Sequence, residues 1–193
     1  MAGGNSYWNV GLTRGTLGFD DATAKTDDAT AGQTQGKFSK LNMSLTHMQA
    51  ITPVDALQVT LSGQKAYANL DSSQKMGVGG PSSVRAYKSG TVSGDSGYFA
   101  SLQWNHQFGA LVNGLLTGSV FFDSAGVTIN HAPWAGLTAA NTATLSGAGL
   151  AVSWANADQL FVSLSAASSV GPSSSLVTDA PEVRVWLQVT QAF

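Results

Sequence analysis

Apolar and polar residues alternate one by one along most of the chain, and this period of two constrains the fold more than any other feature. The alternation is clearest in residues 98–108, where one side carries aromatic and aliphatic groups and the other carries Ser, Gln and Asn. Successive side chains of a strand point to opposite faces, so the pattern predicts a strand with one apolar and one polar face. Seven further segments follow the same rule: 8–13, 41–46, 57–64, 115–123, 149–154, 160–165 and 183–193. The sequence therefore predicts an all-β fold with eight antiparallel strands.

The connections between these segments alternate in length. The short ones are 51–55, 109–114 and 155–158, whereas 20–36, 70–96, 124–143 and 168–182 are long and rich in Gly, Ser, Asp, Asn or Pro. Outer-membrane β-barrels have short turns at one end and long loops at the other, and a soluble sandwich has no reason to sort its loops this way. The pattern favours a transmembrane antiparallel β-barrel.

Composition supports the same class. Charged residues make up only 10% of the 193 residues, against about 25% in a typical soluble domain, which excludes a coiled coil and a charged disordered segment. Nine basic and eleven acidic side chains predict no nucleic-acid partner, and the absence of cysteine excludes thiolate chemistry. No apolar run approaches the length of a transmembrane helix, and we expect any secretion signal to lie upstream of this chain.

The motifs that suggest an enzyme or a metal site lack the residues or the spacing that this chemistry requires. Gly94-Asp95-Ser96-Gly97 is similar to the nucleophile segment of chymotrypsin-like proteases, but neither His47 nor His106 lies in a context suited to a catalytic base. These two histidines and His131 share no metal-ligand spacing. The glycine-rich segment 77–83 lacks the Lys-Ser or Lys-Thr of a phosphate loop. We therefore expect no enzymatic activity, no cofactor and no metal.

The long segment 70–97 carries the most specific signal. It contains Gly79-Gly80-Pro81, then Val84-Arg85-Ala86-Tyr87, then Gly94-Asp95-Ser96-Gly97. In order and spacing these motifs resemble the long sixth extracellular loop of two-partner secretion transporters, the outer-membrane exporters of haemolysins and filamentous haemagglutinins and relatives of the barrel-assembly proteins. The resemblance extends over nearly the whole chain, through residues 5–15, 36–46, 61–69, 121–126, 145–150 and 185–193.

The resemblance implies a sixteen-stranded barrel preceded by periplasmic domains, with residues 1–193 as its C-terminal transmembrane region and last eight strands. An eight-stranded barrel has an interior filled by its own side chains, so it would leave no room for a folded-in loop. The implied function is ATP-independent export of a large partner exoprotein through the bacterial outer membrane. The implied partners are that exoprotein, outer-membrane lipid, the missing N-terminal half-barrel with its periplasmic domains, and the barrel-assembly machinery, for which the C-terminal Phe193 is the expected signal.

The resemblance also implies that the loop turns back into the lumen and that Arg85 at its tip contacts the barrel wall. Asp123 is the candidate partner, since the alternation places it on the polar face of its segment. Two departures from the family pattern stand out: Ala86 where many relatives carry Gly, and Gln103 where Glu is expected. The residues expected to form the loop motif are Gly79, Gly80, Val84, Arg85, Ala86, Tyr87, Gly94, Asp95 and Gly97.

Two alternatives remain open at this point. One is a small autonomous outer-membrane barrel or surface protein without transport activity. The other is a soluble carbohydrate-binding β-sandwich that stacks sugars on its tryptophans, Trp8, Trp104, Trp134, Trp154 and Trp186.

Overall fold

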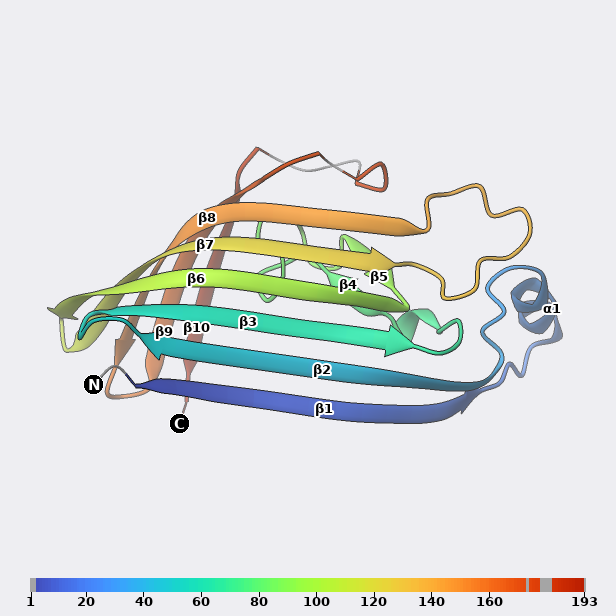
Figure 1. Ribbon diagram of the computed structural model, residues 1–193, viewed down its shortest axis with the longest axis horizontal. Helices are drawn as coiled ribbons and strands as arrows, with labels where there is room; N and C mark the ends of the chain where they lie inside the picture. Colours follow the sequence, from blue (N-terminus) through green and yellow to red (C-terminus); the bar gives the residue numbers. More distant parts are fainter. Residues whose placement is uncertain (1–2, 173, 178–181, 193) are drawn as a thin grey trace.

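A computed structural model describes residues 3–172, 174–177 and 182–192, and most of them lie in one curved antiparallel sheet (Figure 1). The first three strands precede a long connection, and the other five follow it. The eight strands are β1 (Gly4–Leu17), β2 (Gly36–Ala50), β3 (Asp55–Ala66), β6 (Ser96–Leu111), β7 (Gly114–Thr128), β8 (Thr142–Asn156), β9 (Leu160–Ser169) and β10 (Arg184–Gln191).

Each strand of the sheet pairs with its neighbours in chain order, β1-β2-β3-β6-β7-β8-β9-β10. This confirms the predicted antiparallel all-β fold. Within the described residues β1 and β10 are the two edges and do not pair with each other, so the sheet is open. It is also a single layer apart from a small hairpin, which leaves no second sheet for the sandwich alternative. Among the residues described, no helix has the length and apolar character needed to cross a membrane.

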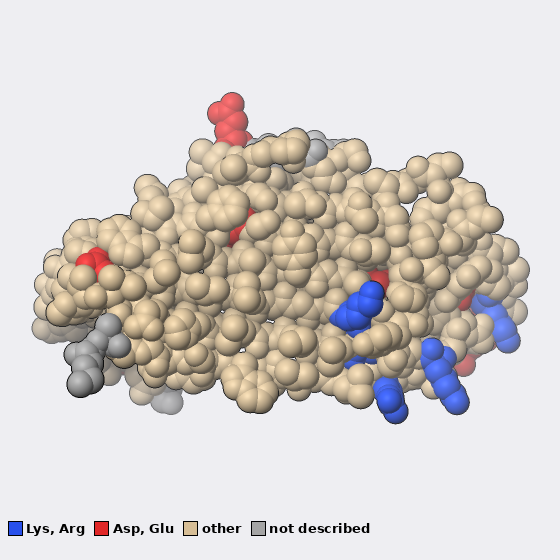
Figure 2. All heavy atoms as spheres, in the orientation of Figure 1, with Lys and Arg blue, Asp and Glu red and all other residues tan. Residues whose placement is uncertain are grey.

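The convex face of the sheet is apolar and exposed. Trp8, Leu45 and Leu61 lie side by side across β1, β2 and β3, and Trp8 is 76% exposed. The space-filling view shows a broad surface almost without charge, with basic groups at the end where the long connections lie (Figure 2). The exposed apolar residues of this face include Val10, Leu12, Met43, Leu102, Trp104, Val120, Phe122, Leu150, Val152, Leu164, Val185, Leu187 and Val189.

The ends of the sheet differ as the connection lengths predict, but the long connections hold more structure than expected. Residues 20–36 contain a helix, α1 (Ala22–Thr30), which alternation analysis did not predict. The Asp21 side chain caps it by accepting a hydrogen bond from the Ala24 amide at 2.8 Å, a local signal that was present in the sequence. Strand β7 also continues to Thr128, well beyond the predicted end at residue 123. Its last residues are small or apolar on both faces, so the alternation is lost while the strand continues.

The connection between β3 and β6, residues 67–95, turns back onto the concave face, and we call it the inner loop (Figure 1). It contains a short 3-10 helix, η1 (Ser72–Gln74), and a two-stranded hairpin, β4 (Met76–Val78) with β5 (Val92–Gly94). None of these elements was predicted.

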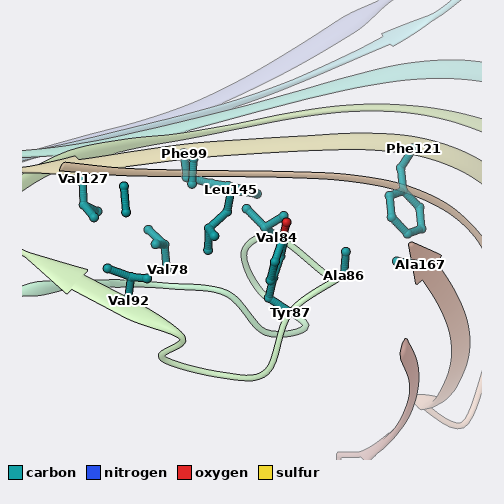
Figure 3. Packing of buried hydrophobic residues seen from close by; sticks show 12 residues of the cluster. Val78, Val84, Ala86, Tyr87, Val92, Phe99, Phe121, Val127, Leu145 and Ala167 are labelled. Atoms are coloured by element: carbon teal, nitrogen blue, oxygen red, sulfur yellow. The ribbon is translucent and has the colours of Figure 1, made fainter. Parts of the chain in front are cut away.

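The inner loop packs through an apolar cluster on the concave face (Figure 3). Val78, Val84 and Tyr87 of the loop meet Phe99 and Leu145 of the sheet, all of them buried. From the alternation, uncharged polar residues were expected on this face. That expectation is wrong where the inner loop covers the sheet, because apolar side chains there are buried against the loop instead of facing water.

Candidate functional site

Two rows of side chains on the concave face form a socket for the tip of the inner loop, residues 79–88. Ser101, Asp123 and Gly147 lie in one row across β6, β7 and β8. Gln103, Phe121 and Gly149 form the next row. Antiparallel register fixes both rows, so the socket follows directly from strand pairing.

Arg85 at the tip and Asp123 on β7 form a bidentate ion pair. Arg85 Nε donates to Asp123 Oδ2 at 2.8 Å, and Arg85 Nη2 donates to Asp123 Oδ1 at 2.8 Å. The Arg85 backbone amide donates to Asp123 Oδ2 at 3.1 Å. The Asp123 side chain is fully buried and that of Arg85 is 14% exposed, so loss of either would leave a desolvated charge. The structure thus brings together the two residues that the sequence analysis paired.

Neutral groups satisfy the rest of the guanidinium. Arg85 Nη1 donates to Gln103 Oε1 at 2.8 Å, Nη2 donates to Ser101 Oγ at 3.2 Å, and Arg85 Cζ lies 3.2 Å from the centroid of the Phe121 ring. Ser101 Oγ in turn donates to Asp123 Oδ1 at 2.7 Å. The negative charge of one carboxylate and the positive charge of one guanidinium therefore compensate each other within the socket. Gln103 supplies a hydrogen bond where the family pattern suggested a second carboxylate.

The edge strand β10 also contacts the tip. Trp186 Nε1 donates to the backbone carbonyl of Arg85 at 2.8 Å, across 101 positions in the sequence. Since Asp123 lies on β7 and Trp186 on β10, the tip is enclosed within the curve of the sheet. The sequence analysis considered Trp186 only as a sugar-stacking candidate and missed this contact.

Glycines allow the tip to turn and to approach the sheet. Gly79 and Gly80 have positive φ angles of 98° and 105°, a region that other residues rarely adopt. The Gly80 amide donates to the Tyr87 carbonyl at 3.0 Å and closes the tip. Ala86 is fully buried beside Gly147, where an added Cβ would lie 2.5 Å from the Ala86 Cβ. The methyl group at position 86 therefore fits because position 147 has no side chain.

The base of the inner loop is held by a second buried carboxylate, that of Asp95. Asp95 Oδ1 accepts from the Leu70 amide at 3.1 Å and lies 3.0 Å from Lys75 Nζ, while Oδ2 accepts from the His131 amide at 2.7 Å. Lys75 Nζ also donates to Asn130 Oδ1 at 3.1 Å. These contacts join the base of the inner loop to the β7–β8 connection. The sequence analysis included Asp95 in the loop motif but missed Lys75.

Gly94 and Gly97 allow the same close approach. An added Cβ would lie 2.5 Å from the Thr128 carbonyl oxygen at Gly94 and 2.7 Å from the Gly126 carbonyl oxygen at Gly97. Ser96 Oγ, between them, accepts a hydrogen bond from the Ala66 amide at 3.0 Å and so ties β6 to the end of β3. The His106 ring contacts Asp55 instead, with Nδ1 2.8 Å from Asp55 Oδ1.

Below the tip, most side chains of the concave face are polar and uncharged, and Phe161 and Trp186 add aromatic surface. A groove of about 410 Å³ lies between the tip and the sheet. Its lining includes Arg85, Asn105, Ser119, Ser153, Ser163 and Gln188. The expected uncharged polar wall is present in this part of the sheet.

Two carboxylates outside the strands have pKa values below the ordinary range. The side-chain hydroxyl and amide of Ser73 hydrogen bond to Asp71 and hold its pKa low. Partial burial opposes ionisation of Asp28, but hydrogen bonds from Thr34 and Gln35 outweigh it and lower the Asp28 pKa. Within the described ranges, no three His, Asp or Glu side chains are grouped to hold a metal ion. Phe193, the expected assembly signal, lies outside the described residues.

Comparison with known proteins places this geometry in a family. Residues 1–153 match the family model described as haemolysin secretion/activation protein ShlB/FhaC/HecB. The heme/hemopexin transporter protein HuxB of Haemophilus influenzae strain 86-028NP is 26% identical over 191 residues, which cover 98% of this chain and 33% of HuxB. HuxB of a second H. influenzae strain gives the same values. The chain thus spans about one third of the length of these relatives.

The fold has a close counterpart among solved structures. CdiB from Escherichia coli superimposes with a TM-score of 0.77 and 20% sequence identity, over 99% of this chain and 34% of the CdiB chain. This likeness concerns the fold alone.

Proposed function

Because the chain belongs to the haemolysin secretion/activation family ShlB/FhaC/HecB, we propose that it forms the C-terminal part of an outer-membrane pore that exports a large partner exoprotein without ATP. In this proposal residues 1–193 are the C-terminal transmembrane barrel region and supply the last eight of sixteen strands. Further strands and the periplasmic domains come from the part of the protein that precedes them. The HuxB relatives are transporters, and no step of the proposed export breaks a covalent bond.

The open edges of the sheet support a larger barrel. Unpaired backbone groups of β1 and β10 would find no water in a bilayer, and only a closed barrel satisfies every strand edge. Added strands pairing with β1 would continue the sheet and enclose the concave face. The resulting lumen would hold the inner loop, which an eight-stranded barrel has no space for.

The exposed apolar face supports the membrane location. Strands of 14 to 16 residues, such as β1, β2 and β6, span roughly 50 Å when extended, enough to cross the apolar core at a tilt and extend beyond it. Trp104 on the convex face pairs with Leu57 near the short turn between β2 and β3, and it suits the interface between headgroups and acyl chains. The long connections would then face the cell exterior and the short turns the periplasm.

The observation that carries the proposal is the docking of Arg85 onto Asp123 inside the curved sheet. It holds a loop of the transporter across the space through which an exported chain would pass. Below it, the groove of hydroxyl and amide groups offers an extended polypeptide no fixed charge except Arg85, which is already paired. The proposed role of the pair is to hold the loop in the position that export requires.

The test is secretion of the partner exoprotein by the complete transporter carrying this chain. Arg85→Ala removes both side-chain hydrogen bonds of the ion pair. We expect the amount of secreted partner to fall while the amount of transporter in the outer membrane stays constant. Lys88→Ala is the matched control, because Lys88 belongs to the same tip but its side chain is exposed. Undiminished secretion by Arg85→Ala would remove the proposed role of the pair.

The proposed barrel size has its own test, the mass of the native protein in outer-membrane fractions on gels with and without boiling. A heat-modifiable band about three times the mass of this 19.8 kDa chain supports the sixteen-stranded transporter. A heat-modifiable band near 19.8 kDa would instead identify a self-contained small barrel.

A further inference from the structure

Three basic residues gather on the convex face at the end of the long connections, and we call them the basic rim: Arg14, Lys37 and Lys65. They lie on β1, β2 and β3 at neighbouring levels, since Thr16 pairs with Lys37, Arg14 with Ser39, and Leu41 with Lys65. Each lies an even number of residues from a convex residue of its own strand, which is Trp8, Leu45 or Leu61. All three side chains therefore point outward. They are exposed. Figure 2 shows basic side chains at this end of the molecule.

Among the residues that the structure describes, no ion pair neutralises the charges of the basic rim. The three ion pairs found among the described residues involve Lys75, Arg85 and His106. Of the nearby carboxylates, Asp21 caps α1 and Asp28 accepts hydrogen bonds from Thr34 and Gln35. Asp20 and Asp27 lie in the same connection. The rim itself therefore presents three cations to its surroundings.

A groove lies between Arg14 and Lys37, and Lys65 lies on the neighbouring strand outside its lining. Its volume is about 480 Å³, and its lining includes Arg14, Lys37, Ser39 and the half-exposed ring of Tyr67. Guanidinium, ammonium, hydroxyl and phenol groups in one groove match a phosphorylated sugar, because Arg binds phosphate with two parallel hydrogen bonds and aromatic rings pack on sugar faces.

Further along the same strands, the convex face offers a second, wholly apolar groove. It has a volume of about 370 Å³ and is lined by Trp8, Val10, Met43, Leu45 and Leu61, with backbone between them. Arg14 and Trp8 are six residues apart on β1, which is about 20 Å along a strand. Cationic and apolar grooves at this separation fit the headgroup and acyl chains of one amphiphile.

We propose that the basic rim binds the phosphorylated headgroup of an anionic glycolipid of the outer leaflet, of the lipid A class, with its acyl chains along the apolar groove. This inference rests on the membrane location proposed above, in which the long connections face the exterior. A soluble anion would need the rim alone, whereas the separate apolar groove on the same strands favours a lipid. The site would fix the depth of β1 to β3 in the bilayer.

The test uses the complete transporter, purified in non-ionic detergent, and lipid A as the probe, with bound copies counted by native mass spectrometry during titration. Each Lys or Arg near a charged lipid surface is worth about a fivefold change in affinity. The triple variant Arg14→Gln/Lys37→Gln/Lys65→Gln should therefore bind lipid A on the order of a hundredfold more weakly. Unchanged binding by the triple variant would overturn the proposal.

A single-charge comparison provides the matched control. Lys37→Gln and Lys25→Gln each remove one positive charge at the same end of the molecule, but Lys25 lies exposed on α1 and does not line the groove. We expect about a fivefold loss for Lys37→Gln and none for Lys25→Gln. Equal losses would show a general charge effect and contradict a defined site.

Changing the lipid tests the site without any variant that might fold poorly. Lipid A without its phosphates should bind the unaltered transporter much more weakly, and excess inorganic phosphate should not displace intact lipid A. Displacement by inorganic phosphate at equal concentration would identify a simple anion site and overturn the lipid assignment. Heat-modifiable migration and partner secretion of each variant are measured in parallel, so that a failure of the pore proposal is distinguished from a failure of the lipid site.

Discussion

The methyl group of Ala86 occupies the space that a side chain on Gly147 would need. An added Cβ at Gly147 would lie 2.5 Å from the Ala86 Cβ and 3.1 Å from the Ser168 carbonyl oxygen. The tip of the inner loop and strand β8 therefore fit each other at a specific pair of positions, and neither residue alone explains the fit.

This pair predicts a reciprocal effect of substitution. Gly147→Ala should push the tip out of its socket, with a cost of about 1 to 3 kcal/mol for overpacking, and Ala86→Gly in the same protein should restore much of the docking. Protease cleavage within the inner loop measures docking. Similar cleavage of the single Gly147→Ala variant and the double variant would contradict the fit described here.

Breaking the Arg85–Asp123 pair on one side should cost more than removing both charges. Asp123→Ala leaves Arg85 without its carboxylate, a loss of about 3 to 5 kcal/mol for a buried pair, whereas Arg85→Met with Asp123→Leu leaves no uncompensated charge. The free energy of unfolding in lipid or detergent, measured by urea titration, compares the three proteins. A double variant no more stable than Asp123→Ala would contradict the expected cost of the unpaired Arg85 charge.

The base of the loop should depend on Asp95 in a way that can be measured locally. Asp95→Asn removes the charge that pairs with Lys75 and turns one acceptor into a donor that faces the amides of Leu70 or His131. We expect faster hydrogen exchange at those two amides and no slower exchange at any other amide. Asp158→Asn, in an exposed turn between β8 and β9, serves as the control and should leave both amides unchanged.

The α1 connection should loosen in acid. Hydrogen bonds from Thr34 and Gln35 favour the ionised form of Asp28, so its pKa lies below the ordinary value of about 3.8. A carboxylate whose pKa is lowered by folding stabilises the folded state when the pH is above its ordinary pKa. This stabilisation is lost as the pH falls through the pKa of the folded state. The amide proton shift of Thr34, followed by nuclear magnetic resonance, should therefore titrate with a midpoint below that of an exposed aspartate. Asp28→Asn should abolish the titration.

The sheet could be predicted from sequence because period two is a local pattern. Along residues 100–105 of β6, apolar and polar residues alternate, so the polarity of each residue indicates the face on which it lies. The prediction failed at the end of β7, where Ser124, Ala125 and Gly126 blur the alternation although backbone pairing with β6 and β8 continues. Strand ends depend on the partner strand, which a single segment does not reveal.

The candidate site was less predictable, because its contacts join distant parts of the chain. Arg85 and Asp123 were paired through a family resemblance and a strand face. Nothing local indicates that the Lys75 ammonium group reaches Asn130 or that the Trp186 indole reaches Arg85. Phe121 shows the same limit, since an aromatic residue on a face expected to be wet is explained only by the guanidinium of Arg85 that covers it.

The contact between Trp186 and Arg85 has a consequence for the order of events during folding. The residues that hold the Arg85 side chain lie on β6 and β7, directly after the inner loop in the chain, but Trp186 lies on β10. A contact across 101 positions closes a long loop and forms only after the intervening strands are in place. The tip therefore has its full set of partners only when β10 has joined the sheet, so the completed socket marks a sheet that is paired from β6 to β10.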